Sequence, residues 1–342
     1  MAGDPVWDEA PLGAGAAVLA YDIGGTDTKA ALFDSAGRML GLSRTATPLR
    51  GAGTADAVLD LVERLAAGFD RDFPGVQPEA VGMVAPGIVD DEPGIGIHSA
   101  NLHWDNVPFK TLAQARLRLP ASFSHDVRAA GGAEHQLGAA RPFRDVVVMV
   151  IGTGIAASII LGGRAHIAGG FAGEIGHSIV DPRGDRCACG AIGCLETVAS
   201  ASAIVRRYRL AVGRTPAQTP AEPMPAGAKQ VLALATAGDP HAQRVWDEAL
   251  DALALVIAQL ASMLAPEAVV IGGGLAQAGD ALFVPLRERV GALLTFHRPP
   301  LLLPARIGEN AGLIGAALRA RAAADRSAAL SGATTLMGIG TA

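Results

Sequence analysis

The stretch AVLAYDIGGTDTKAALFD, at residues 17–34, decides the architecture predicted for the start of the chain. An apolar run ends at Asp22, a glycine-glycine-threonine segment follows at 24–26, and a second apolar run comes after it. Apolar runs separated by glycines are typical of strands joined by a tight turn. The stretch therefore predicts a β-hairpin whose turn is small enough for a ligand to approach its backbone.

The same layout returns at residues 146–164, VVVMVIGTGIAASIILGGR. When IGGTDTKAALF is set beneath IGTGIAASIIL, an apolar strand, a glycine-threonine turn and a second apolar strand align. Such self-similarity predicts two lobes that share the same opening element. The alternative is that any hairpin with small turn residues has this appearance.

The remaining pattern alternates strands and helices and predicts an α/β protein. Strands are expected at 39–47, 80–86, 119–126 and 267–272. Helices are expected at 54–70, directly after Asp126, at 197–212 and 241–264, and in the closing segment NAGLIGAALRARAAA. The segment RTPAQTPAEPMPAGA, at 214–228, predicts a surface loop because proline and alanine dominate it.

Composition excludes several classes of protein. Half of the 342 residues are hydrophobic and the net charge is −5, so a large core is expected and a nucleic-acid-binding face is not. The acidic start MAGDPVWDEAPLGAG does not resemble a signal peptide, and GTG interrupts the apolar run at 146–162, which argues against a membrane span. Three cysteines without a signal peptide predict a cytoplasmic protein rather than a disulfide scaffold.

The two glycine-threonine turns predict phosphate binding. Glycines let backbone N–H groups approach phosphate oxygens, and a threonine hydroxyl or a lysine adds donors. Asp22, at the end of its strand, could hold a hydrated Mg²⁺. The candidates are Gly24, Gly25, Thr26 and Lys29, with Gly152, Thr153 and Gly154 in the second turn. The alternative is two hairpins without a ligand; the chain has no P-loop motif.

Asp126 is the candidate for the base that a phosphoryl-transfer enzyme needs. It follows an apolar strand and precedes a helix, which would place it at the carboxyl end of a strand. From these residues alone, a plain helix N-cap is the favoured interpretation of Asp126.

All three cysteines lie in FAGEIGHSIVDPRGDRCACGAIGCLE, at 171–196. His177, Cys187, Cys189 and Cys194 supply four nitrogen and sulfur ligands in a glycine-rich segment, which suits a structural, tetrahedral Zn²⁺. The alternative is three small buried residues beside an unrelated histidine. Glu174 and Glu196 flank the cluster, so a metal that orders this loop would also order two carboxylates able to bind hydroxyl groups, with His177 serving both metal and ligand.

These segments resemble the ROK sugar kinases (repressor, ORF, kinase), and most closely the bacterial glucokinases of that family. The likeness extends from about residue 17 to 322 and is carried by DIGGTDTK, GTGIAASIILGGR, GFAGEIGH, CACGAIGCLE and IGENAGLIGAAL. The glycine-rich E-x-G-H segment followed by C-x-C-G-x-x-G-C-L-E is the most specific of these. The resemblance implies a two-lobed actin-like ATPase fold, of the hexokinase and ribonuclease H-like type, with sugar and ATP between the lobes.

The resemblance also assigns roles to residues. It places both glycine-threonine turns at the ATP phosphates and implies that Asp126 is the catalytic base rather than a simple cap. The implied adenosine neighbours are Gly272, Gly273 and Gly274; the implied sugar-binding residues are Asn101, His125, Asp126, Glu174, His177 and Glu196; and the implied zinc ligands are His177, Cys187, Cys189 and Cys194.

One segment departs from the family pattern. The family usually has Asn-Asp before the helix, often continuing as Asn-Asp-Ala-Asn, whereas this chain has HDVR. His125 therefore stands where an asparagine normally contacts the sugar, and Arg128 replaces a second asparagine. An imidazole offers one donor and one acceptor in a different geometry, so the identity of the sugar is open.

The function expected from the sequence is ATP-dependent phosphorylation of a hexose, with glucose and its 6-hydroxyl as the family default and Mg²⁺ and structural Zn²⁺ as cofactors. The alternatives are an N-acetylglucosamine or N-acetylmannosamine kinase, a sugar-responsive transcriptional regulator, and polyphosphate as donor. A homodimer or homotetramer is expected, without nucleic-acid or membrane partners.

The expected division of the chain is a flexible tail at 1–15, an N-terminal lobe at 16–126 that includes a closing helix at 306–323, a C-terminal lobe at 127–305 with the zinc loop at 171–196, and a flexible tail at 324–342.

Overall fold

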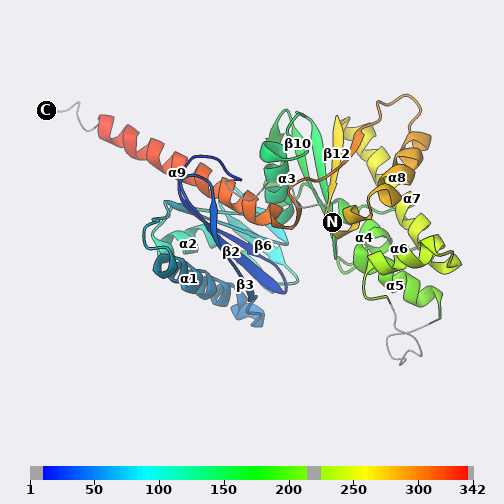
Figure 1. Ribbon diagram of the computed structural model, residues 1–342, viewed down its shortest axis with the longest axis horizontal. Helices are drawn as coiled ribbons and strands as arrows, with labels where there is room; N and C mark the ends of the chain where they lie inside the picture. Colours follow the sequence, from blue (N-terminus) through cyan, green and yellow to red (C-terminus); the bar gives the residue numbers. More distant parts are fainter. Residues whose placement is uncertain (1–10, 214–224, 338–342) are drawn as a thin grey trace. The chain divides into compact units, whose positions relative to one another are not determined.

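The computed structural model describes residues 11–213 and 225–337, which form two compact units (Figure 1). The first unit contains the described residues up to Ala133, the segment Ile167–Ala172 and the residues from Glu309 onward. The second unit contains Glu134–His166 and Gly173–Gly308. Most of the proline-rich loop expected at 214–228 lies outside the described residues, as do the first ten and last five residues of the expected tails.

Both units contain a five-stranded sheet with the same order and directions. In each, three antiparallel strands are followed across the sheet by two strands that run parallel to the third. The first sheet has the order β3 (Met39–Ala46), β2 (Asp27–Phe33), β1 (Val18–Ile23), β4 (Ala80–Ala85), β8 (Ala121–His125). The second has the order β11 (Arg164–Ala165), β10 (Ile155–Leu161), β9 (Val146–Ile151), β12 (Ala268–Gly272), β13 (Leu301–Pro304). The repeat predicted from the two hairpins is thus confirmed, and both turns occupy the same place in their sheets.

In the first unit, helices cover both faces of the sheet (Figure 1). Helix α1 (Thr54–Asp72) buries Val58, Leu59 and Val62 against the side chains of β1 and β2. On the other face, α9 (Ala311–Met337) packs along β1, β4 and β8. Gly82 of β4 allows this close approach, because a Cβ there would lie 1.9 Å from the carbonyl oxygen of Ala316.

The other elements of this unit are a small sheet and α2. The sheet consists of β5 (Ile88–Asp90), β6 (Ile95–Ser99) and β7 (Trp104–Val107), and α2 spans Phe109–Leu117. Phe109 contacts both Trp104 and Phe123, at ring-centroid distances of 4.6 and 4.5 Å, so one aromatic cluster joins the small sheet, α2 and β8. The chain between β6 and β7 carries Asn101.

The closing helix is longer than the sequence predicted. It begins at Ala311 and continues to Met337, so the segment expected to be a flexible tail from 324 is helical over its described part. Ala323 and Ala324 remain buried, and no glycine or proline follows Gly315 until Gly332, which explains the extension. The described end of the N-terminal tail is also fixed, because Arg321 donates hydrogen bonds to the carbonyl oxygens of Leu12 and Gly13 at 2.9 and 2.8 Å.

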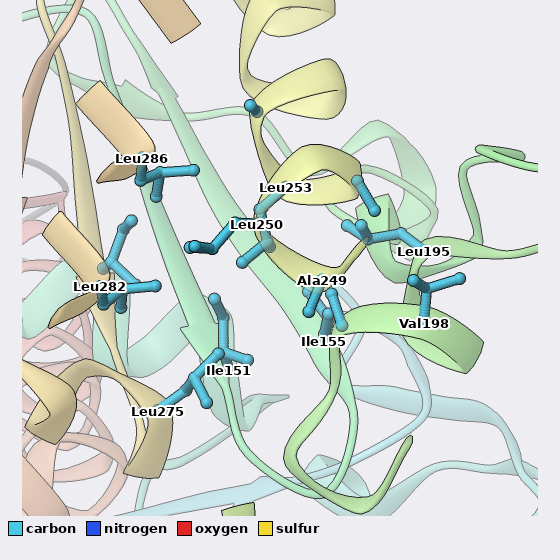
Figure 2. Packing of buried hydrophobic residues seen from close by; sticks show 14 of the residues in the cluster. Ile151, Ile155, Leu195, Val198, Ala249, Leu250, Leu253, Leu275, Leu282 and Leu286 are labelled. Carbon is cyan, nitrogen blue, oxygen red and sulfur yellow. The ribbon is translucent and has the colours of Figure 1, made fainter. Parts of the chain in front are cut away.

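The core of the second unit lies between its sheet and a layer of helices. These are α4 (Leu195–Ala199), α5 (Ala201–Ala211), α6 (Ala228–Thr236), α7 (Pro240–Leu264) and α8 (Asp280–Leu293). Figure 2 shows Ile151 and Ile155 pointing from β9 and β10 into this core, toward Leu250 and Leu195. Since these two isoleucines flank the second glycine-threonine turn, the core holds both ends of that turn.

The single helix expected at 197–212 is two helices. Ser200 separates α4 from α5: its backbone is extended, with ψ of 156°, and its hydroxyl oxygen accepts the N–H of Ala203 at 3.1 Å. Serine favours such a cap because its oxygen replaces a missing helical partner. The prediction was wrong here because the apolar spacing continues across the break.

No helix among residues 11–213 and 225–337 is long and apolar enough to cross a membrane. The apolar run at 146–162 forms β9, the turn and β10.

Candidate functional site

The first glycine-threonine turn is held by polar contacts on both sides. The N–H of Gly24 donates to the carbonyl oxygen of Asp27 at 2.9 Å. Thr47, just after β3, donates from its hydroxyl to the carbonyl oxygen of Gly24 at 2.7 Å and from its N–H to that of Thr26 at 2.8 Å. The turn is therefore rigid without a ligand, which lowers the entropic cost of binding one.

Two other predicted residues lie beside this turn. Asn101 approaches Gly25, because its Cβ is 3.8 Å from the position that a Cβ on Gly25 would take. Lys29, paired with Asp22 across the hairpin, donates from Nζ to the carbonyl oxygen of Glu309 at 2.7 Å. An ammonium has three donors, so this contact fixes Lys29 and leaves others for a ligand.

Asp22 and Asp126 form an electrostatically coupled pair in the first unit. The pKa of Asp22 is raised to about 6; burial is the largest cause, the charge of Asp126 also raises it, and Lys29 partly opposes both effects. Asp22 also faces the first turn of α9, where a Cβ on Gly312 would lie 2.8 Å from Asp22 Oδ2. Two neighbouring carboxylates leave negative charge that no nearby cation fully balances. Carboxylate oxygens are ligands that suit Mg²⁺.

Asp126 is the first residue of α3 (Asp126–Leu137), but it is not the cap of that helix. Among the described residues, its Oδ1 accepts the N–H of the adjacent Val127 at 2.6 Å and lies 3.4 Å from His125 Nδ1. The N–H of Arg128 instead donates to His125 Nδ1 at 3.4 Å. The capping bond thus comes from His125, which leaves the Asp126 carboxylate, with 30% of its side chain exposed, available for a reactant.

This capping bond fixes the orientation of His125. The ring is buried, and an Nδ1 that accepts a backbone N–H places the ring proton on Nε2. A ligand that contacts Nε2 of His125 would therefore contact a hydrogen-bond donor. An asparagine at this position could offer a donor or an acceptor.

The second glycine-threonine turn is held by the two helices that follow the cysteine segment. Gly152 accepts the N–H of Ala201 at 2.9 Å, and Thr153 accepts the hydroxyl of Ser202 at 2.6 Å through its carbonyl oxygen. Glu196 Oε2 accepts the N–H of Ile155 at 2.9 Å. The turn and the end of the cysteine segment are thus parts of one structure.

The glycine triplet at 272–274 lies against this second turn. Gly273 has φ of 82°, and a Cβ there would lie 2.4 Å from the carbonyl oxygen of Ile151, which precedes the turn. Only glycine combines this conformation with so close an approach. The structure therefore brings Gly272–Gly274 together with Gly152–Gly154.

The predicted metal ligands converge. One ligand atom from each of His177, Cys187, Cys189 and Cys194 lies within 4.8 Å of all the others. The sulfurs of Cys189 and Cys194 are 3.6 Å apart, as are Cys187 Sγ and His177 Nδ1. Ligands on a tetrahedral Zn²⁺ at about 2.3 Å would be about 3.8 Å apart, so the donor set fits the ion.

Electrostatics also favours a cation at this cluster. Burial, followed by the neighbouring thiols, raises the pKa of Cys194 to about 12, whereas the N–H of Ala191 is the main cause that lowers the pKa of Cys189. A divalent ion would supply the charge needed to hold several thiolates together.

The histidine of the cluster has two distinct faces. His177 Nδ1 is directed at Cys187, and Nε2 lies 3.9 Å from Glu174 Oε2. The geometry is compatible with a metal on one nitrogen and a ligand near the other. Glu174 is held close by because Gly173, with φ of 100°, accepts the N–H of Ala157 at 2.8 Å.

The predicted residues therefore form one group in each unit. The first unit contains the first turn with Asp22, Lys29, Asn101, His125 and Asp126; the second contains the second turn with Gly272–Gly274, Glu174, Glu196 and the metal cluster. Sequence reasoning missed Thr47 and Glu309, which hold the first turn and Lys29 through contacts distant in the chain. Only Thr47 carries a local signal, as a buried polar residue directly after an apolar strand.

Known proteins resemble this chain over most of its length. The family model described as ROK family matches residues 18–323. A glucokinase of Streptomyces coelicolor is 32% identical over 316 residues, covering 89% of this chain and 97% of that protein. An N-acetylmannosamine kinase of Escherichia coli O1:K1 is 34% identical over 312 residues, covering 89% of this chain and 98% of that protein.

A solved structure extends the similarity to the fold. The ROK family glucokinase of Streptomyces griseus, in complex with glucose and AMPPNP, superposes with a TM-score of 0.74 at 32% identity, covering 89% of this chain and 99% of that one. The expected actin-like ATPase fold is confirmed by this similarity and by the two matching sheets.

Proposed function

This chain belongs to the ROK family, and from that membership and the geometry of the two groups we propose that it is an ATP-dependent sugar kinase. The acceptor we propose is a hexose, with glucose phosphorylated at its 6-hydroxyl as the first candidate. The proposal draws on the similarity to curated glucokinases and on the carboxylate that α3 presents at its first residue.

The observation that carries the proposal is the state of Asp126. Asp126 directly follows β8, a buried parallel strand; its carboxylate is not used as a helix cap, and it is close enough to Asp22 for their charges to interact. A base in phosphoryl transfer needs an available carboxylate oxygen near the phosphate-binding groups. We propose that Asp126 accepts the proton of the sugar hydroxyl as the γ-phosphoryl group is transferred.

The phosphates would be bound by backbone and cation together. The N–H groups of Gly24–Thr26 and of Gly152–Gly154, with Lys29, would stabilise the negative charge of the transferred group. Asp22 would hold Mg²⁺, directly or through its waters; this ion would neutralise charge on the phosphates. Gly272–Gly274 would lie beside the adenosine.

The sugar would be bound by polar side chains. We propose Asn101 and His125 from the first unit and Glu174, His177 and Glu196 from the second. Glu196 uses Oε2 for Ile155, so Oε1 is the oxygen available to a hydroxyl. Zn²⁺ on His177 and the three cysteines would have a structural role, because four protein ligands leave no open position.

An amino-sugar kinase is the second candidate, favoured by one feature of the chain. His125 presents an Nε2 donor where the family pattern has an asparagine, and a donor suits the carbonyl oxygen of an N-acetyl group. The similarity to N-acetylmannosamine kinases is of the same order as that to glucokinases.

A coupled assay of ADP release would test these assignments. Glucose, mannose, N-acetylglucosamine and N-acetylmannosamine would be compared as acceptors, with ATP and polyphosphate as donors. Asp126→Ala should retain sugar binding by calorimetry while kcat falls by about 10³-fold or more, because both the base and its charge are lost. Near-normal turnover in that variant would remove Asp126 from the mechanism, and absence of phosphoryl transfer to all sugars would refute the kinase proposal.

A further inference from the structure

Three charged residues form a row across the sheet of the first unit, beside the first glycine-threonine turn. Asp22 of β1 is the register partner of Lys29 in β2, and Lys29 is the register partner of Arg44 in β3. Side chains of directly paired residues lie on the same face of a sheet. The register therefore places Arg44 one strand beyond Lys29, on the face that carries Asp22.

The side chains of this row reach one short segment at the start of α9. Lys29 Nζ donates to the carbonyl oxygen of Glu309 at 2.7 Å, and Arg44 Nη2 lies 3.9 Å from Glu309 Oε2. Asp22 Oδ2 would lie 2.8 Å from a Cβ on Gly312. All of these residues belong to the first unit, so the row and its neighbours are parts of one compact structure.

Arg44 also reaches the residue that follows the turn. Its Nη1 lies 3.9 Å from Asp27 Oδ2, and the carbonyl oxygen of Asp27 closes the turn by accepting the N–H of Gly24 at 2.9 Å. The guanidinium therefore has one nitrogen near the end of the turn and another near the start of α9. This places it beside the backbone for which we propose phosphate contacts.

The contacts of Arg44 are loose. Among residues 11–213 and 225–337, its guanidinium has two ion pairs, both at 3.9 Å, and no side-chain hydrogen bond. Its side chain is 54% exposed, and those of Asp27 and Glu309 are 42% and 80% exposed. Solvent screens such pairs, and they contribute little to stability. The guanidinium is therefore available for a ligand.

The pairing of Lys29 with Arg44 favours an anionic ligand. Like charges directly opposite each other destabilise a pair of antiparallel strands, and an anion beside both would remove the repulsion. A guanidinium binds two phosphate oxygens through its planar fork, whereas an ammonium binds phosphate as a point charge. The two cations together therefore suit a phosphate group with several charged oxygens.

We propose that Arg44 is a further phosphate-binding residue of this site. It exchanges its loose contacts with Asp27 and Glu309 for oxygens of the phosphoryl donor, next to the phosphate group bound by Lys29. The inference rests on the proposed function, which puts the phosphates of the donor at the first turn.

Calorimetry with the non-hydrolysable ATP analogue AMPPNP and Mg²⁺, without sugar, tests the proposal directly. In Arg44→Gln the Kd for AMPPNP should rise about tenfold, because a charge-assisted contact is lost. Arg71→Gln is the matched control: it removes an exposed arginine, paired with Asp72 at 3.3 Å, on α1 at the opposite face of the sheet, and should leave this Kd unchanged. An equal rise in both variants, no rise in Arg44→Gln, or a wild-type protein that binds no AMPPNP would overturn the proposal.

Glu309→Gln should change the same Kd in the opposite direction. The variant removes the carboxylate that competes for Arg44 and keeps the carbonyl oxygen that holds Lys29, so AMPPNP should bind about twofold more tightly or equally well. If the ion pair itself were what orders this region, losing either partner would weaken binding. A rise in Kd in Glu309→Gln as large as that in Arg44→Gln would therefore overturn the proposal.

Arg44→Lys separates the charge from the fork. A lysine keeps the cation and loses the second N–H group, so the Kd for AMPPNP should lie between those of the wild type and Arg44→Gln. A Kd in Arg44→Lys that equals that of Arg44→Gln would show that the charge of residue 44 does not act on the phosphates, and would overturn the proposal.

Steady-state kinetics separates this inference from the proposed function. In Arg44→Gln, KM for ATP should rise about tenfold while KM for the acceptor sugar changes less than about twofold. If the wild type transfers phosphate to a sugar and Arg44→Gln keeps the wild-type KM for ATP, the inference fails and the kinase proposal stands. If the wild type transfers phosphate to no sugar, the kinase proposal fails, and the AMPPNP titrations still decide whether Arg44 binds phosphate.

Discussion

Glu196 accepts the backbone N–H of Ile155 at 2.9 Å, so the carboxylate that follows the last cysteine is bonded to the residue that ends the second glycine-threonine turn. A Cβ on Gly154 would lie 2.4 Å from the same oxygen. Since the turn is a proposed phosphate-binding element and Glu196 a proposed sugar-binding residue, one contact couples both proposed functions within the second unit.

Gly154→Ala should therefore weaken sugar binding. The added methyl group would displace the Glu196 carboxylate, because that carboxylate is the end of a flexible side chain and moves more easily than the backbone. We expect the Kd for glucose, or for the acceptor that the screen identifies, to rise about tenfold by calorimetry without nucleotide. Gly152→Ala is the control, since a Cβ there has no heavy atom within 4 Å and should leave this Kd unchanged. The same Kd in both variants would contradict the coupling.

Cys189→Ser should abolish stoichiometric zinc. Serine is a poor zinc ligand, and the three remaining ligands would leave the ion exposed at this open side of the cluster. We expect metal analysis to give one zinc per wild-type chain and much less in the variant, with a lower Tm. Removal of zinc from the wild type by a chelator should lower its Tm to that of the variant. A wild-type protein that is purified without zinc and gains no stability when zinc is added would contradict the assignment.

Asp22→Asn should stabilise the magnesium-free protein at neutral pH. Burial, with a smaller effect from the charge of Asp126, raises the pKa of Asp22 from 3.8 to about 6 in the folded state, so the folded protein binds this proton more tightly than the unfolded chain does. The stabilising contribution of the protonated carboxyl is complete below about pH 4 and is lost as pH rises through 6, at a cost of about 3 kcal/mol. In denaturant titrations the variant should match the wild type near pH 4, gain on it as pH rises to about 6, and keep that advantage at higher pH. Asp72→Asn, which removes an exposed carboxylate, should show no such pH dependence; an Asp22→Asn curve parallel to the wild type would refute the shift.

Arg321→Met should destabilise the first unit. Arg321 is buried and donates to four carbonyl oxygens, those of Leu12, Gly13, Ala16 and Asp34. Methionine keeps most of the volume and removes every donor, so we expect the free energy of unfolding to fall by about 3 kcal/mol. Arg38→Met breaks an ion pair in which the Arg38 side chain is 61% exposed, while the buried Asp34 carboxylate keeps the backbone N–H of residue 38, so the variant should cost less than about 1 kcal/mol. Similar losses in the two variants, measured by urea unfolding, would show that the carbonyl contacts contribute little.

The local elements of this fold were predictable because their signals are short in sequence. Both hairpins, α1, α7 and the strand before Asp126 were predicted from apolar runs and their bounding residues, and the structure confirms them. Helix ends were predicted less well. The break at Ser200 and the extension of α9 to Met337 depend on which side chains find partners, and apolar spacing does not carry that information.

The sequence by itself determined the repeated hairpin, the convergence of four metal-type ligands in one segment, and membership of the ROK family, because these depend on residues close together in the chain. Only the tertiary structure decided that His125 rather than Asp126 caps α3, that Glu196 is bonded to the second turn, and that Arg128 shares a buried carboxylate with Arg319. The last two of these contacts join residues far apart in sequence. The first depends on the direction in which two neighbouring side chains leave a strand end. Such directions are set by the packing of the whole unit, which no short pattern of residues specifies.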